Sequence, residues 1–412
     1  MNTTTTKTRV VGVLKDGALN SLVGVTGLIG IAGAMVVTSV SLFLSDEVRV
    51  SPLMIGLFFA TRAGSEIFCD LVVGALSDRL SSRRSLLVIC AVFSGLGAIC
   101  YLLMRNYYAL LVTGAVFFGI GGAVFSQLFA YTREFADRRG VDAAFFNSAL
   151  RSVTSVAWIV GPPFGFYLIA SRGFGSLFLV AAVFYLLSAA LCVLGLPDTR
   201  GGAAAEEAGG EGTGEKAGEE AAPAPRSAFR GLTPKVRAML AVIVLMLTVN
   251  SMYQINIALF VTKDLGLGAG FTGILLGLSA ALEIPLMIWT GAKAERIGKW
   301  RLVTVAAVCA VVFFGALPFA DSPVALLLLQ VPNALYVAIV LSIPVVILQN
   351  AMSDRIGAAS ALYGASFKAG NFLGGMIAGV VAQGLGYTNV FWVCAAISAV
   401  AAVLLVTGGT DE

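Results

Sequence analysis

The sequence predicts an all-α membrane protein in which twelve transmembrane helices form two pseudo-symmetric six-helix bundles. Three observations favour this fold class. First, 58% of the 412 residues are hydrophobic and only 12% are charged, with a mean hydropathy of +0.91, which is far from the composition of a soluble domain. Second, apolar stretches of about 20 residues or more recur, and that length crosses roughly 30 Å of hydrocarbon. Third, the two halves repeat one pattern of charged residues and glycines.

Each apolar stretch is predicted to be a helix, because an open strand cannot satisfy its backbone hydrogen bonds in lipid. The predicted spans are residues 18–44, 52–76, 85–104, 107–131, 143–170, 174–196, 237–262, 270–292, 300–320, 323–349, 357–382 and 388–407. The first follows basic residues, as in a secretory signal, but it is too long for one and no small-residue cleavage site follows it.

The longest break in hydrophobicity lies between the sixth and seventh spans. It contains the stretch GGAAAEEAGGEGTGEKAGEEAAPAP, which has too few apolar side chains to fold. The sequence therefore predicts three parts: an N-terminal six-helix bundle at 1–196, a disordered cytoplasmic linker at 197–236 and a C-terminal six-helix bundle at 237–412.

The distribution of positive charge predicts the orientation. When the N-terminus is placed inside, most of the 27 Lys and Arg residues fall in inner segments, and the outer loops hold Arg49, Arg105, Arg172 and Lys263. Both termini are therefore predicted to be cytoplasmic, in a multi-pass membrane protein. The net charge of +4 reflects this topology, so no nucleic-acid partner is expected.

The segments SEIFCDLVVGALSDRLSSRR (65–84) and LEIPLMIWTGAKAERIGKWR (282–301) carry the third observation. Glu66, Gly74, Asp78, Arg79 and Arg84 recur as Glu283, Gly291, Glu295, Arg296 and Arg301, with a constant offset of 217 residues (283 − 66). Internal repeats of membrane spans are typical of secondary transporters, whose substrate lies between the repeats.

Composition excludes several other functions. The chain has no histidine, so a His-based triad, metal site or proton relay is absent. Its six cysteines lie in apolar spans without metal-like spacing, and no phosphate-binding loop is present. We therefore expect no enzyme activity, no metal and no cofactor, and an ion gradient as the source of energy.

Ionisable side chains inside predicted spans are costly and indicate function. They are Arg62, Glu66, Asp70, Arg151, Glu283 and Lys368, together with Arg133 near the end of the fourth span. Arg151 and Lys368 share the 217-residue offset, so the acid and the base are both duplicated. If the bundles meet as in other two-bundle transporters, Glu66 pairs with Lys368 and Arg151 pairs with Glu283.

Two roles for these pairs stay open: a gate or proton-sensitive latch, or plain docking of the bundles. Arg62, Glu66 and Asp70, at i, i+4 and i+8, offer a third possibility, because they can neutralise one another along one helix face.

The loop after the second span has its own predicted role. Asp78 can cap the positive end of a neighbouring helix, while Arg79 and Arg84 anchor the loop at anionic lipid or carboxylates. Gly74 completes this motif, which Gly291, Glu295, Arg296 and Arg301 echo in the second half. We predict a cytoplasmic gate motif here.

With this loop and with GPPFG (161–165) in the fifth span, the sequence resembles the major facilitator superfamily over all twelve spans. The prolines of GPPFG remove hydrogen-bond donors and its glycines allow close packing. The fourth span, TGAVFFGIGGA, lacks the buried arginine of many drug–proton antiporters in that superfamily.

A narrower resemblance rests on five segments: REFADRR (133–139), FFNSALRSVTSVAWIVGPP (145–163), NSMYQINIALF (250–260), LEIPLM (282–287) and QNAMSDRIGAASALYGASFKAGN (349–371). In these the chain is similar to the bacterial sugar efflux transporters. The resemblance implies a monomeric, proton-coupled exporter of lactose, glucose or related glycosides, which works by alternating access.

A sugar site needs uncharged hydrogen-bonding groups and an aromatic surface. The predicted substrate-binding residues are Gln127, Asn147, Arg151, Trp158, Asn250, Tyr253, Gln254, Gln330, Asn333 and Asn371. Each can instead form hydrogen bonds between helices, which is the commoner role of a single polar residue in a span.

Two other functions remain open at this point. One is a multidrug/proton antiporter of the same fold, which would have a wider and more aromatic cavity. The other is a nontransporting membrane sensor that holds a partner through the 197–235 segment.

Overall fold

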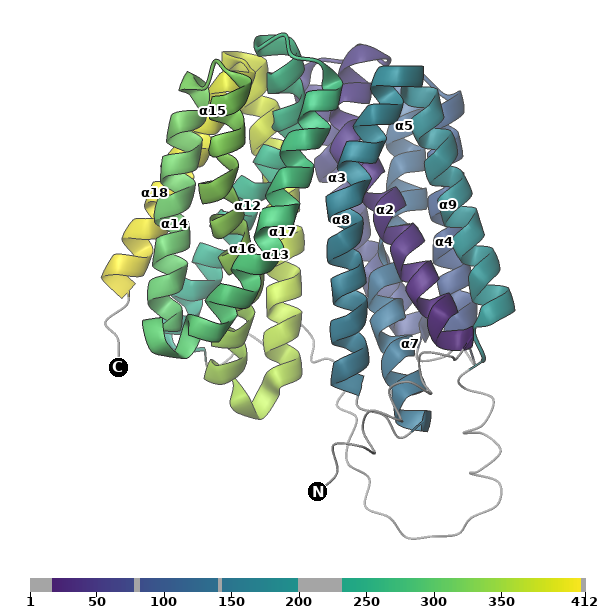
Figure 1. Ribbon diagram of the computed structural model, residues 1–412. Coiled ribbons are helices and arrows are strands. Elements are labelled where there is room, and N and C mark those ends of the chain that lie inside the picture. The colour runs from purple at the N-terminus through teal and green to yellow at the C-terminus, as the bar shows by residue number, and fades with distance from the viewer. Residues whose placement is uncertain (1–16, 78–81, 140–142, 199–231, 409–412) are drawn as a thin grey trace. The chain divides into compact units, whose positions relative to one another are not determined.

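The computed structural model describes residues 17–77, 82–139, 143–198 and 232–408, and all regular elements in these ranges are helical (Figure 1). The first half contains α2 (Gly17–Asp46), α3 (Pro52–Ser77), α4 (Arg83–Leu103), α5 (Tyr107–Thr113), the π-helical turn η1 (Gly114–Phe118), α6 (Gly119–Gly122), α7 (Val124–Arg139), α8 (Ala143–Arg172) and α9 (Phe174–Gly195). The second half contains α12 (Pro234–Leu259), the π-helical turn η2 (Phe260–Asp264), α13 (Ala269–Ile297), α14 (Lys299–Ala316), η3 (Leu317–Phe319), α15 (Pro323–Leu328), α16 (Gln330–Ala351), η4 (Ser353–Arg355), α17 (Ile356–Leu385) and α18 (Tyr387–Gly408).

The predicted spans are confirmed at the level of individual helices. Within the described ranges, eleven helices are long and apolar enough to cross a membrane. The remaining long helix, α3, is less apolar because it carries Arg62, Glu66 and Asp70. Large apolar side chains stay exposed on the helix surfaces, including Leu103, Leu194 and Ile288 at 73%, 85% and 70%. Such exposure is natural for side chains that face acyl chains.

Helix ends follow local sequence signals. Asn106 accepts a hydrogen bond from the Ala109 N–H at 3.1 Å and begins α5. Thr233 and Ser322 cap α12 and α15, each followed by a proline at the first helical position, where a missing N–H has no cost. Between α13 and α14 the chain turns at Gly298, whose φ of 96° favours glycine.

The described chain forms two compact units. The first comprises residues up to Val37 and Ser65–Asp198, and the second comprises Thr38–Gly64 and the chain from Leu232 onward. The predicted bundles at 1–196 and 237–412 remain a prediction, and by local packing Thr38–Gly64 belongs to the second unit. The reason is local contact: the Leu53 N–H lies 3.4 Å from Oε1 of Gln383, and Asp46 pairs with Lys263 at 2.6 Å.

The first unit packs closely where glycines face neighbouring helices. A Cβ atom built on Gly161 of the GPPFG motif would lie 2.7 Å from Cβ of Ala34 and 3.1 Å from the Ile31 carbonyl oxygen on α2. One built on Gly30 would lie 2.7 Å from Cβ of Ala157 on α8. The motif therefore fixes the contact between α2 and α8, as expected for small residues in membrane helices.

In the second unit, α12 is the central helix. It packs against α16, α17 and α18 and is buried along most of its length. Its Tyr253 ring lies 5.3 Å from the ring of Phe313 and 6.0 Å from that of Phe314, and Phe314 lies 6.1 Å from Tyr336. These edge-on aromatic contacts form the core between α12, α14 and α16.

Replacing Gly161 with alanine is expected to lower the free energy of unfolding by about 1–3 kcal/mol, because the added methyl overpacks the α2–α8 contact. The matched control is Gly364→Ala in α17, where an added Cβ meets no described atom within 4 Å. Thermal unfolding in detergent measures both variants. A Gly161→Ala protein as stable as Gly364→Ala would contradict the close-packing account.

Candidate functional site

The charged side chains predicted for the second span lie on α3. Arg62, Glu66 and Asp70 are all half-buried, and their spacing places them along one face of the helix. Each interacts with other groups in the structure. This face of α3 thus brings three ionisable groups into the middle of a membrane-spanning helix.

The basic residue of the first unit lies on α8. Its side chain, that of Arg151, is exposed, and its guanidinium carbon is 5.5 Å from the centre of the Phe129 ring on α7. A cation over an aromatic face is attracted to it, so this contact holds the guanidinium beside α7. Trp158, two turns along the helix, is half-buried, and the side chain of Asn147 lies outside the described residues.

The second unit carries the repeated acid and base. Glu283 is half-buried on α13, two residues before the in-helix Pro285, and no hydrogen bond or ion pair joins it to the described residues of its own unit. Lys368 on α17 is half-buried and has an interaction. The predicted pairs, Glu66–Lys368 and Arg151–Glu283, each draw one member from either unit, so both remain predictions.

Three predicted sugar-binding residues form a buried network in the second unit. The Tyr253 hydroxyl donates to Oε1 of Gln330 at 3.3 Å, and Nδ2 of Asn333 donates to the same oxygen at 3.1 Å. Nδ2 of Asn333 also lies 2.9 Å from Oγ of Ser279 on α13. The exposed fractions are 3% for Tyr253, 0% for Gln330 and 1% for Asn333. In this conformation these groups join α12, α13 and α16.

Two buried amide oxygens have no hydrogen-bond partner within the described ranges. They are Oε1 of Gln127 on α7 and Oδ1 of Asn333 on α16. A buried acceptor without a donor is costly. Each of these oxygens is available to accept a hydrogen bond from water or from a ligand hydroxyl. Of the other amides predicted to bind sugar, Asn250 is buried, whereas Gln254 and Asn371 are half-buried.

At the predicted cytoplasmic end of the first unit, charged groups tie three helices together. Arg83 forms an ion pair with Glu134 of α7, and Nη1 of Arg84 donates to the Leu196 carbonyl at 3.1 Å. The Tyr131 hydroxyl donates to the Pro197 carbonyl at 2.8 Å. Sequence reasoning missed Glu134, although it lies within REFADRR.

The rest of the gate motif is described in part. Asp78 and Arg79 lie outside the described residues, as do the surroundings of Gly74. In the second copy, Glu295 forms an ion pair with Lys299, while Arg296 and Arg301 are exposed. A Cβ on Gly291 would meet no described atom within 4 Å, so this glycine is not required by close packing.

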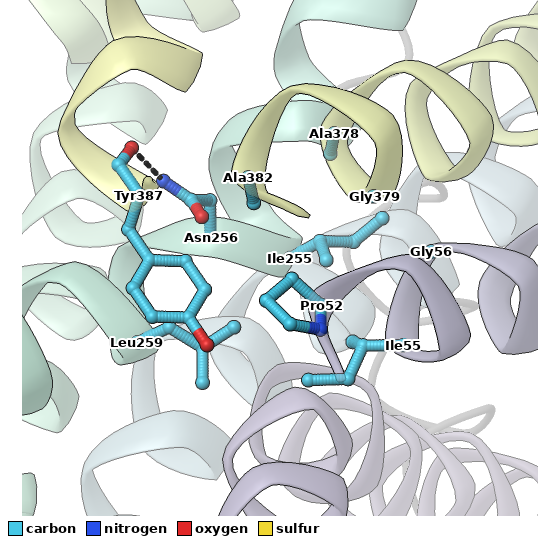
Figure 2. Close-up of a pocket in the computed structure, with 10 residues that line it drawn as sticks. All are labelled: Pro52, Ile55, Gly56, Ile255, Asn256, Leu259, Ala378, Gly379, Ala382 and Tyr387. Carbon is cyan, nitrogen blue, oxygen red and sulfur yellow. Dashed lines mark hydrogen bonds between the residues drawn. The ribbon is translucent and has the colours of Figure 1, made fainter. Parts of the chain in front are cut away.

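A small pocket lies within the second unit where α3, α12, α17 and α18 meet (Figure 2). Its lining is mainly apolar, and Nδ2 of Asn256 donates to the Tyr387 carbonyl at 2.8 Å. A Cβ on Gly56 would lie 2.4 Å from the Gly375 carbonyl oxygen and 2.5 Å from Cα of Gly379. None of the predicted sugar-binding residues lines this pocket, so it is a packing joint.

Membrane-spanning helices in two repeated halves, each with an acid and a base within its spans, are typical of multi-pass secondary transporters. The family model of the Major Facilitator Superfamily matches residues 22–355. Sugar efflux transporter A of Escherichia coli is 34% identical over 389 residues, which cover 94% of this chain and 95% of that protein. Sugar efflux transporter B of Salmonella typhimurium is 34% identical over 365 residues, 89% of each chain. The chain belongs to the major facilitator superfamily, in the family of these sugar efflux transporters.

A solved structure gives the same fold. The nucleoside transporter NupG matches with a TM-score of 0.76 at 15% identity, over 96% of this chain and 100% of that chain. At this identity the likeness concerns the fold alone, and it agrees with the predicted twelve-helix fold.

Replacing Gln330 with alanine is expected to lower the free energy of unfolding by about 1–3 kcal/mol, because two buried donors lose their shared acceptor. The control for the unfolding measurement alone is Gln254→Ala on α12, whose side chain is half-buried. Thermal unfolding and sugar binding are measured together. Unchanged stability with weakened binding in Gln330→Ala would show that Gln330 serves the substrate and not the helix contact.

Proposed function

We propose that this protein exports small sugars or glycosides, of the lactose and glucose class, across a bacterial inner membrane. One observation carries the proposal: relatives named sugar efflux transporters are similar to it over 94% and 89% of its length, across both copies of the repeat. The protein works as a monomer by alternating access, and an inward proton gradient drives the sugar outward.

Uncharged hydrogen-bonding groups support a sugar substrate. The acceptors of Gln127 and Asn333 lack donors within the described ranges, and sugar hydroxyls are donors of the required kind. Half-buried amides at Gln254 and Asn371 and the half-buried ring of Trp158 add polar and flat apolar surface. We propose that these residues, with Asn147, Asn250, Tyr253 and Gln330, contribute to the binding cavity during the transport cycle.

The duplicated charges support proton coupling. An ionised carboxylate in an apolar membrane interior is costly unless it is paired, and Glu66 and Glu283 both lie in that interior. We propose that each pairs with the base of the other half, Glu66 with Lys368 and Glu283 with Arg151. Protonation removes the negative charge, so the base is released and one closed side of the transporter can open.

The gate motif fits this cycle. Desolvation offsets much of the attraction in a buried ion pair, so such pairs suit contacts that form and break. On the cytoplasmic side, where both termini are proposed to lie, Asp78 and Arg79 of the loop and the Arg84 contact at the end of α9 hold the inner surface. Arginines there also meet anionic lipid head groups.

Glu66→Gln and Glu283→Gln are each expected to abolish proton-driven sugar movement, because the glutamine amide does not take up or release a proton near neutral pH. The measurement uses proteoliposomes, with radiolabelled lactose or glucose and an imposed pH gradient. Sugar counterflow without a gradient should persist in both variants. The matched control is Asp321→Asn, an exposed acid between α14 and α15, which should behave as the parent.

The same vesicles separate the alternatives. Transport of cationic dyes in place of sugars would favour a multidrug antiporter. Full proton coupling in both glutamine variants would remove Glu66 and Glu283 from the mechanism. Deletion of 199–231 should spare a transporter and disable a sensor that binds its partner through this segment.

A further inference from the structure

The fourth span is interrupted in its first half by a π-helical turn. This turn, η1, lies between α5 and α6, and single π turns inside α-helices often mark functional positions. The hydroxyl of Ser65 on α3 donates to the Ala115 carbonyl of the turn at 2.5 Å. The same carbonyl accepts the N–H of Gly119. Ser65 therefore ties α3 to the turn, immediately before Glu66.

Two glycines after the turn leave room for α3. A Cβ on Gly119 would lie 2.3 Å from Oγ of Ser65 and 3.2 Å from Sγ of Cys69. One on Gly122 would lie 3.1 Å from Cγ and 3.4 Å from Cδ of Glu66. A side chain at position 119 would require the Ser65 side chain to move, and one at position 122 would require the Glu66 side chain to shift by a few tenths of an ångström. We call Ser65, Gly119 and Gly122 the span-four seam.

The seam is present in only one copy of the repeat. The offset of 217 residues (283 − 66) aligns Gly119, Gly122 and Ser65 with Tyr336, Ile339 and Leu282. Tyr336 is fully buried and donates its hydroxyl to the Met246 carbonyl at 2.6 Å. The second half thus folds with large side chains where the first has glycines, so the repeated fold does not itself require the seam.

We propose that the span-four seam positions the Glu66 carboxyl for proton coupling. Ser65, Gly119 and Gly122 are then positioning residues, which act through Glu66 and bind neither sugar nor proton. This inference rests on the proposed role of Glu66. The stretch from Tyr107 to Thr132 has no charged side chain, so the fourth span brings no charge to Glu66. Arg62 and Asp70 lie one turn away on either side along its own helix, and Lys368 is its proposed partner.

The test compares Gly122→Ala and Ser65→Ala, each made in the parent and in Glu66→Gln. Gly122→Ala adds a methyl beside the carboxyl, whereas Ser65→Ala removes the tether without adding volume, so it serves if the first variant does not fold. In the parent, both should lower gradient-driven sugar movement by about three- to tenfold, as expected for a small misplacement of a reacting group. Both should also shift its pH dependence and leave counterflow unchanged.

The control is Gly315→Ala on α14, where a new Cβ meets no described atom within 4 Å; it should match the parent. In the Glu66→Gln background, where gradient-driven movement is already abolished, neither seam variant should lower sugar counterflow. Two results would overturn the proposal and leave the seam with a packing role only. In the first, both seam variants keep the pH dependence of the parent. In the second, they lower counterflow equally in the parent and in the Glu66→Gln background. A Glu66→Gln protein with full proton coupling would instead refute the proposed role of Glu66, and the seam's role with it.

Discussion

The high cost of an unpaired polar group in hydrocarbon is the constraint on which this structure depends. Backbone groups meet it by forming helices throughout the described ranges. Hydroxyls meet it within the helix, as when Thr132 donates to the Leu128 carbonyl at 2.7 Å, and amides meet it in networks such as Tyr253, Gln330 and Asn333. Ionisable groups cannot be satisfied so simply, and the few that remain inside the spans are therefore the best candidates for function.

Packing follows from the same environment. Apolar side chains gain little by leaving lipid for another helix, so close backbone approach must supply the contact energy. Gly30 and Gly161 do this between α2 and α8, Gly56 and Gly379 between α3 and α17, and Gly119 and Gly122 between α3 and the fourth span. These contacts differ in one respect: the last places the Glu66 carboxyl, which we propose exchanges a proton, beside a glycine.

Hydropathy and the repeat were sufficient to predict the spans and the duplicated charges, because both depend on composition along the chain. The family came from the resemblance of five segments to the sugar efflux transporters. The packing of Thr38–Gly64 in the second unit was not predictable from local patterns, because contacts such as that of Leu53 with Gln383 join residues 330 positions apart in the chain. Periodicity placed Tyr253 on one helix face but could not say whether that face meets a cavity or Gln330. The π turn had no sequence signal beyond the glycines that follow it.

One claim is central to the proposed mechanism: an acid of each half is neutralised by the base of the other, and protonation ends that attraction. A charge exchange tests it most directly, with sugar counterflow measured for Glu66→Lys, Lys368→Glu and the double variant. Each single variant is expected to lose counterflow, and the double variant is expected to regain it. A double variant that folds in the membrane yet remains as inactive as the single variants would contradict the claim.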